Sequence, residues 1–212
     1  MGDIRSSYLI AADSAVALLR EPAVAARWEE PSALAEFGVA GLSGHFVGQI
    51  IRTHEVLRLD VPPQKPISLM GHYARAPWVR TGIDHESNVV LRRVGEQAAA
   101  GGVVALADQV EEMLEEQRRT LLDEPADRVV PLPWVGWSLL LDDYLLTRTL
   151  ELVIHADDLA VSVGVATPEL PSEVTEPVID LLARLAVHRH GPTAVIRALS
   201  RAERAPATVS AF

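Results

Sequence analysis

One segment of this chain, residues 139–163, has the composition of a long helix that is buried on nearly all sides. Its sequence, LLLDDYLLTRTLELVIHADDLAVSV, contains no glycine or proline and is long enough for about seven helical turns. Leucine, valine, isoleucine and alanine cover most of the helix circumference, and such a helix belongs in the centre of a fold rather than at its surface. We therefore expect the rest of the chain to pack around this segment.

A narrow polar stripe interrupts this apolar surface. At about 100° per residue, six side chains fall within roughly 80° of one another: Tyr144, Arg148, Glu151, His155, Asp158 and Ser162. Because burying charged groups without partners is costly, the stripe requires internal partners or a metal ion. Glu151 and His155 are one helical turn apart, a spacing at which two side chains can bind the same ion.

Composition excludes several classes of protein. The chain has 212 residues and a formal net charge of −10, which argues against a nucleic-acid surface, since phosphate binding needs clustered positive charge. It contains no cysteine, so disulfides, thiolate metal sites and a cysteine nucleophile are excluded. We see no signal peptide and no apolar run of membrane-spanning length, and therefore expect a cytoplasmic protein that does not bind membranes.

The remaining periodic segments predict an all-α protein. Apolar residues recur at helical spacing in six further segments: residues 4–20, 37–57, 84–100, 103–122, 172–190 and 193–203. Residues 21–32, the proline-rich stretch 58–83 and residues 125–136 are expected to be connections without helix. We expect a four-helix bundle with accessory helices over residues 1–165, and C-terminal helices and a tail, residues 166–212, packed on that bundle.

The predicted helix at residues 37–57 is unusually rich in glycine. Each glycine costs up to about 1 kcal/mol in a helix interior, and the four are Gly38, Gly41, Gly44 and Gly48. Two explanations remain open, close packing against another helix or room for a ligand. His45, Gln49 and Arg52 share one face of this helix, whereas His54 lies about 180° from His45 and cannot serve the same site.

His45, Glu151 and His155 form a candidate metal site. Two histidines and one carboxylate suit Zn²⁺ or another divalent ion, and three protein ligands leave one coordination position open for water or substrate. The alternative is that Glu151 and His155 form a hydrogen-bonded or ion-paired cluster with Arg148, because buried polar groups are commonly satisfied in this way. The spacing alone leaves both interpretations open.

Two charged members of the polar stripe have a binding and a structural interpretation. Arg148 could anchor an anionic substrate or simply neutralise Glu151. Asp158 could orient a histidine ring, or it could join a network with Arg52 or Arg80. The sequence does not choose between these roles.

The less polar candidates are treated in the same way. Tyr144 and Gln49 could line a pocket or could be polar tips in the core, and Trp78 and Arg80 could close over the site from residues 58–83. Four histidines are expected to be solvated or to lie at helix ends: His72, His85, His188 and His190.

Three stretches of the sequence resemble one known family. They are GLSGHFVGQI around His45, DYLLTRTLELVIHADDLAVSVG around Glu151 and His155, and GPTAVIRALSRAERAP near the C-terminus. The chain is similar to the DinB-like four-helix-bundle proteins, specifically the actinobacterial family of mycothiol-dependent maleylpyruvate isomerase N-terminal domains. In that family a histidine from the second helix and an E-x-x-x-H motif from the last bundle helix bind a divalent metal, typically Zn²⁺. The resemblance places His45, Glu151 and His155 at those positions.

The resemblance implies a metal-dependent enzyme that uses a low-molecular-weight thiol of the mycothiol type and an electrophilic small-molecule substrate. A metal stabilises the nucleophilic thiolate, and a chain without cysteine needs an external thiol for such chemistry. Isomerases and S-transferases of this kind begin with the same nucleophile, so both remain open. The family's isomerase has a separate C-terminal substrate-binding domain, but only residues 165–212 follow Gly164 here, and maleylpyruvate itself is not the expected substrate.

Two alternatives belong to other classes of protein. The bundle could be a non-catalytic small-molecule-binding or regulatory module, with its polar stripe filled by a ligand or by ion pairs. It could also be a metal-dependent hydrolase that activates water at the open coordination position. The oligomeric state is left open between monomer and dimer.

Overall fold

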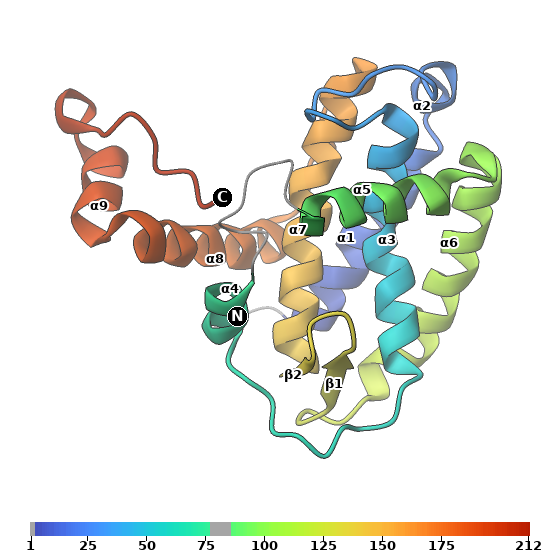
Figure 1. The fold of residues 1–212 in the computed structure, drawn as a ribbon, viewed down its shortest axis with the longest axis horizontal. Coiled ribbons are helices and arrows are strands. Elements are labelled where there is room, and N and C mark those ends of the chain that lie inside the picture. Colours follow the sequence, from blue (N-terminus) through green and yellow to red (C-terminus); the bar gives the residue numbers. More distant parts are fainter. Residues whose placement is uncertain (1–2, 77–85) are drawn as a thin grey trace.

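The computed structural model describes residues 3–76 and 86–212. The elements are α1 (Ile4–Leu19), α2 (Pro22–Ala26), α3 (Val39–Leu57), α4 (Leu69–Arg75), α5 (Glu86–Ala99), α6 (Gly102–Thr120), β1 (Val129–Leu132), β2 (Trp137–Leu140), α7 (Leu141–Val163), α8 (Ser172–His190) and α9 (Pro192–Ser200) (Figure 1). The predicted all-α class is confirmed, because one two-stranded hairpin is the only sheet within the described ranges. No helix in those ranges has both the length and the apolar composition to cross a membrane.

Four long helices, α1, α3, α6 and α7, pack around one apolar core. Helix α7 lies against α1 and α3, and α6 lies against the same two helices. Large side chains that are fully buried come from all four helices and include Tyr8, Phe46, Leu106 and Tyr144. Burial of apolar surface is the dominant favourable term in folding, at roughly 25 cal/mol per Å². The core therefore holds α3 and α7 side by side, although they are far apart in the sequence.

Helix α7 is buried as its apolar composition predicts. Among its residues only Asp157 and Val161 are exposed. The helix ends at Gly164, whose φ of 73° and ψ of 33° place it in the left-handed region that glycine adopts without strain. It begins at Leu141, slightly later than predicted, because the two leucines before it belong to strand β2.

The glycines of α3 serve two different purposes. A Cβ atom on Gly44 would overlap the backbone carbonyl oxygen of Gly95 in α5, and a Cβ atom on Gly95 would lie 2.5 Å from the carbonyl oxygen of Gly41. These glycines let the backbones of α3 and α5 cross in direct contact. A Cβ atom on Gly48, by contrast, would have no atom of the described residues within 4 Å. Close packing explains Gly44, whereas Gly48 borders open space.

The prediction that residues 58–83 contain no helix is wrong, because α4 lies within this stretch. The Ser68 side chain caps α4 by accepting a hydrogen bond from the backbone N–H of Gly71 at 3.1 Å, and Leu69 and Tyr73 are buried. A helix of 7 residues has too few turns to show apolar periodicity, and it depends on tertiary packing for stability. The proline-rich sequence around it therefore dominated the prediction.

The predicted connections at residues 125–136 and 21–32 also contain regular structure. Strands β1 and β2 pair in antiparallel fashion, with Val129 opposite Leu140. The turn between them includes Gly136, which has a φ of 80°. The short helix α2 begins at Pro22, a position where the missing N–H of proline does no harm. Elements this short carry weak sequence signals.

Helices α8 and α9 extend sideways from the bundle (Figure 1). Helix α8 packs on α7 and α1, and α9 packs on α8. A second apolar cluster joins α4, α7 and α8 through Leu69, Tyr73, Leu150, Val178, Leu181 and Leu185. Helix α4 is thereby fixed beside α7. The division of the chain at residue 165 stays a prediction.

Candidate metal centre

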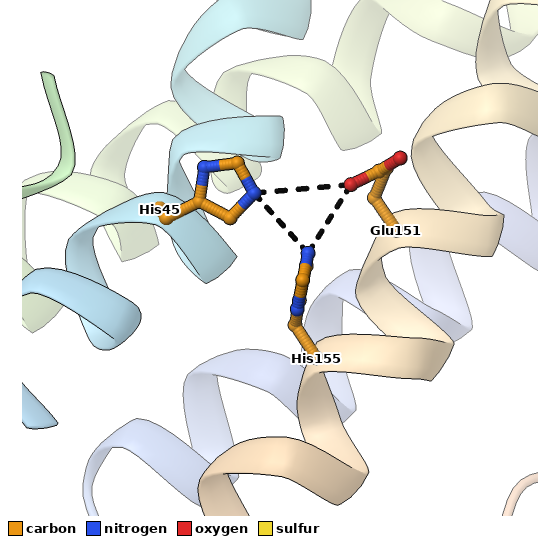
Figure 2. Close-up of side chains that lie close together, drawn as sticks. All are labelled: His45, Glu151 and His155. Atoms are coloured by element: carbon orange, nitrogen blue, oxygen red, sulfur yellow. Dashed lines mark hydrogen bonds and ion pairs between the residues drawn. The ribbon is translucent and has the colours of Figure 1, made fainter. Parts of the chain in front are cut away.

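His45 of α3 and the α7 residues Glu151 and His155 point toward a common centre (Figure 2). The Nε2 atoms of the two histidines are 3.1 Å apart. The Oε2 atom of Glu151 lies 3.2 Å from Nε2 of His155 and 3.8 Å from Nε2 of His45. Glu151 and His155 meet because they are one turn apart on one helix, whereas His45 reaches them through the packing of α3 on α7.

The spacing of these three atoms fits a single metal ion. Ligand atoms about 2.1 Å from a tetrahedral ion lie roughly 3.4 Å from one another, and the observed separations of 3.1, 3.2 and 3.8 Å lie on both sides of that value. Two imidazole nitrogens and one carboxylate oxygen form a set that zinc and other divalent ions accept. Three protein ligands would also leave one position for an exchangeable ligand. The residues therefore fit the metal that the resemblance implies.

Asp158 orients the ring of His155. Its Oδ2 atom lies 2.8 Å from Nδ1 of His155, and the two residues are three apart on α7. If Nδ1 donates its proton to this carboxylate, Nε2 carries the lone pair that faces the centre. Of the two roles considered for Asp158, the structure shows the contact needed for orientation.

When no metal is bound, the electrostatic environment keeps one proton on His155. Burial, and then the charge of His155, lower the pKa of His45. Burial would also lower the pKa of His155, but its hydrogen bonds to Asp158 and Glu151 outweigh this effect and raise it to about 9. Burial would raise the pKa of Glu151, yet the hydrogen bonds from His155 and His45 hold it well below its ordinary value. A metal ion therefore has to displace the proton of His155 at neutral pH.

Arg148 is not the hydrogen-bonding partner of Glu151. Its Nη1 atom donates to Oε1 of Gln49 at 2.5 Å, its Nε atom donates to Oγ1 of Thr147 at 3.0 Å, and its guanidinium lies 5.2 Å from the ring centre of Tyr144. Gln49 in turn donates to the backbone oxygen of the metal-site histidine on α3 at 3.0 Å. Arg148 and Gln49 therefore join α7 to α3 beside the centre. The Tyr144 ring is fully buried, and its hydroxyl has no hydrogen-bond partner within the described residues.

Arg52 lies close to the centre but outside it. Its guanidinium is 5.4 Å from the ring centre of Trp134, a residue of the β-hairpin turn that the sequence did not identify as part of the site. Arg52, His45 and Gly48 line a common pocket between α3 and α5. The approach of Trp134 depends on the docking of the hairpin, and no pattern in the sequence indicates it.

Three residues considered in the sequence, Trp78, Arg80 and His85, lie outside the described residues. Of the two positions predicted for His72, solvated or at a helix end, the structure shows the second, because the residue lies in the last turn of α4. It is not solvated, since it is 2% exposed and its Nδ1 atom accepts a hydrogen bond from Nε1 of Trp137 at 3.1 Å. Burial, and then the charge of Arg148, lower the pKa of His72 to about 4. This residue therefore stays neutral at physiological pH.

The fold and the site together define a class of protein. It is a helical bundle in which two neighbouring helices direct two histidines and a glutamate toward one position that fits a single metal ion. Residues 9–160 match the family described as the mycothiol maleylpyruvate isomerase N-terminal domain. The match spans more than half of the chain, including His45, Glu151 and His155, so the chain belongs to this family. Searches of curated proteins and of solved structures found no match.

Proposed function

We propose that the chain is an enzyme that depends on a divalent metal, Zn²⁺ by preference, and uses a low-molecular-weight thiol of the mycothiol type as cofactor or cosubstrate. The observation that carries this proposal is the convergence of His45, Glu151 and His155 in a member of this family. A set of three ligands is typical of catalytic zinc sites, whereas structural zinc sites are usually closed by four. The proposed activity is that of an isomerase or an S-transferase acting on a small electrophile.

The protein groups would hold the ion and shield it. His45, Glu151 and His155 would bind it, and Asp158 would keep Nε2 of His155 turned toward it. A bound divalent ion supplies one function here, the stabilisation of a thiol as its nucleophilic thiolate. The thiol has to come from solution, because the chain has no cysteine. The three ligand side chains are only 11%, 24% and 13% exposed, which limits the access of water.

The isomerase and transferase activities differ in the fate of the carbon–sulfur bond. In both, the sulfur attacks an electrophilic carbon of the substrate. An isomerase breaks that bond again and returns the thiol, whereas a transferase leaves the sulfur in the product. The same metal centre suits both outcomes. A product assay with one equivalent of thiol distinguishes an isomerase, which returns the thiol, from a transferase, which leaves the sulfur in the product.

Metal analysis of protein purified without chelator is the first test. We expect close to one equivalent of a divalent ion per chain. His45→Ala should lose the ion and remain helical by circular dichroism, because it removes one of three ligands from a packed bundle. The matched control is His54→Ala on the same helix, since His54 faces away from the centre and lies 4.0 Å from Glu116. Well under one equivalent in the wild type, or normal retention in His45→Ala, would contradict the proposed site.

Cobalt substitution tests the role of the thiol. If the thiol enters the open position, its addition should change the visible spectrum of the cobalt protein. A panel of electrophiles and esters, assayed with and without thiol, then tests the reaction. An absent spectral response would favour the non-catalytic binding module, and ester cleavage without thiol would favour the hydrolase.

A further inference from the structure

A pocket of about 100 Å³ lies between α3 and α5 beside the candidate metal centre. His45 lines it, and so does Arg52, which is about two helical turns farther along α3. Gly48 lies between these two residues and also lines the pocket. Because no atom of residues 3–76 or 86–212 lies within 4 Å of the position that a Cβ of Gly48 would take, the missing side chain leaves space there among these residues. The pocket thus connects a candidate metal ligand with a cationic side chain.

Arg52 lies at this pocket in a cation–π contact rather than in an ion pair. Its guanidinium lies 5.4 Å from the ring centre of Trp134, which comes from the β-hairpin. Within residues 3–76 and 86–212, its side chain has this aromatic contact but no hydrogen bond or ion pair. A guanidinium has five N–H donors in its plane, and a contact with an aromatic face does not use them as hydrogen bonds to oxygen. Arg52 therefore presents unused donors in a partly buried position.

The charges around the pocket favour an anion. Burial, and then repulsion from the positive charge of Arg148, lower the pKa of Arg52 more than the charges of Glu151 and Glu55 raise it. Arg148 donates its own hydrogen bonds to neutral side chains. Of the two nearby carboxylates, Glu151 is engaged by the histidines, and Glu55 lines the pocket as an exposed residue. A divalent ion at the centre would add to the positive charge.

We propose that Arg52, in contact with the Trp134 ring, binds a carboxylate of the electrophilic substrate, so that the pocket selects small electrophiles that carry this group. A guanidinium holds a carboxylate through two parallel N–H bonds, which fixes orientation as well as position. The substrate would lie over Gly48, with its carboxylate at Arg52 and its reacting carbon nearer to His45. The identity of the reacting molecule rests on the proposed function, whereas carboxylate binding itself does not require the metal.

Binding to chelator-treated, metal-free protein tests the carboxylate site by itself. The probes are propionate and propionamide, which have nearly the same shape and differ in charge, and binding can be followed by NMR titration. Propionate should bind and propionamide should bind at least about 10-fold more weakly, because a hydrogen-bonded charged group contributes roughly 1.5–3 kcal/mol. Equal binding of the two probes would overturn the proposal.

Variants assign the binding to Arg52. Arg52→Gln should weaken propionate binding about 10- to 100-fold, and Arg52→Lys, which keeps the charge but not the two-pronged geometry, should be intermediate. The matched control is Arg58→Gln, because Arg58 follows α3 and pairs with Glu116 at the surface. Gly48→Leu should also abolish binding by filling the pocket while Arg52 stays in place. Wild-type affinity in Gly48→Leu or Arg52→Gln would overturn the proposal.

Turnover by the metal-loaded enzyme tests whether the anion belongs to the electrophile. With thiol present, Arg52→Gln should lower kcat/KM for acrylate about 10- to 100-fold and should leave kcat/KM for acrylamide nearly unchanged. Equal losses for both electrophiles would overturn the assignment to the substrate. If the protein binds no metal but binds propionate selectively, the proposed function fails and the carboxylate site remains supported. If it binds metal normally but does not bind propionate selectively, only the carboxylate site is refuted.

Discussion

The two helices that carry the candidate ligands, α3 and α7, hold them in different ways. On α7, His155 is fixed by Asp158 and lies within 3.2 Å of Glu151, so the orientation of this half is built within one helix. On α3, the ring of His45 packs at 5.7 Å from that of Phe37, and its Nδ1 atom has no hydrogen bond to the described residues. Helix α7 therefore orients the ring of His155 and supplies the carboxylate charges beside it. Helix α3 brings His45 close to that ring and borders the open space at Gly48.

Within α3 the same contrast separates two glycines. Gly44 is needed because the backbone of α5 occupies the place of its side chain. Gly48 is present although no residue that the structure describes occupies that place, which is unexpected for a residue with poor helix propensity. Gly44 is explained by the fold, whereas we assign Gly48 to the proposed ligand pocket, and substitutions can test each assignment.

The largest expected effect is that of Gly44→Ala. The new methyl group would overlap the carbonyl oxygen of Gly95, so α3 and α5 would have to separate, at a cost of about 3 kcal/mol or more in the free energy of unfolding. Urea unfolding followed by circular dichroism measures it. Unchanged or raised stability would show that the close crossing of α3 and α5 is not required.

The second prediction uses the opposite pKa shifts of the two histidines. Without metal, the pKa of His155 is raised to about 9, above its ordinary 6.5, so its stabilising effect is complete below pH 6.5 and is lost as the pH rises through 9. The loss is up to about 3 kcal/mol. Urea unfolding of chelator-treated protein at pH 6.5 and 9.5 measures it.

Matched variants make this pH test specific to α7. His155→Gln should remove the loss of stability above pH 6.5. His45→Gln should leave it in place, because the pKa of His45 is lowered and this residue is already neutral there. Metal-loaded protein should not show the loss, since the metal has displaced the proton. A pH dependence that persists in His155→Gln would contradict the assignment of the proton to α7.

The third prediction concerns the orientation that α7 supplies. Asp158→Ala should weaken zinc binding about 10- to 100-fold, because the partner of a ligating histidine fixes its ring and tautomer. Asp158→Asn retains an acceptor oxygen and should be intermediate. The control is Asp157→Ala, whose exposed carboxylate accepts a hydrogen bond from Thr167 at 2.5 Å instead. Equal affinities of the two alanine variants in competition with a chelator would show that Asp158 does not act through His155.

The smallest effect is expected for Gly48→Ala. This substitution should raise the free energy of unfolding by about 0.5–1 kcal/mol, because alanine has the better helix propensity and its methyl group enters open space. Together with Gly44→Ala, it forms a pair of identical substitutions one turn apart with opposite signs. A loss of stability in Gly48→Ala would mean that the space beside α3 closes in solution.

The sequence was most informative where the relevant geometry lies within one helix. The 3.6-residue period placed Glu151, His155 and Asp158 on one face of α7, and the structure shows that they are in contact. The same period predicted the long helices of the bundle and the burial of α7. It missed α4 and the hairpin, because elements of 7 and 4 residues are too short to show a period and are stabilised by packing.

Contacts between elements were decided by the tertiary structure. The residues suggested His45 as a partner of Glu151 and His155, but their spacing could not establish that α3 packs this histidine against α7. The spacing also could not show that Arg148 bonds to Gln49 rather than to Glu151, or that the Trp134 ring lies beside the guanidinium of Arg52. The physical reason is that a helix fixes the relative positions of its own residues through backbone geometry, whereas the choice of facing residues depends on how separate elements bury their apolar surfaces together.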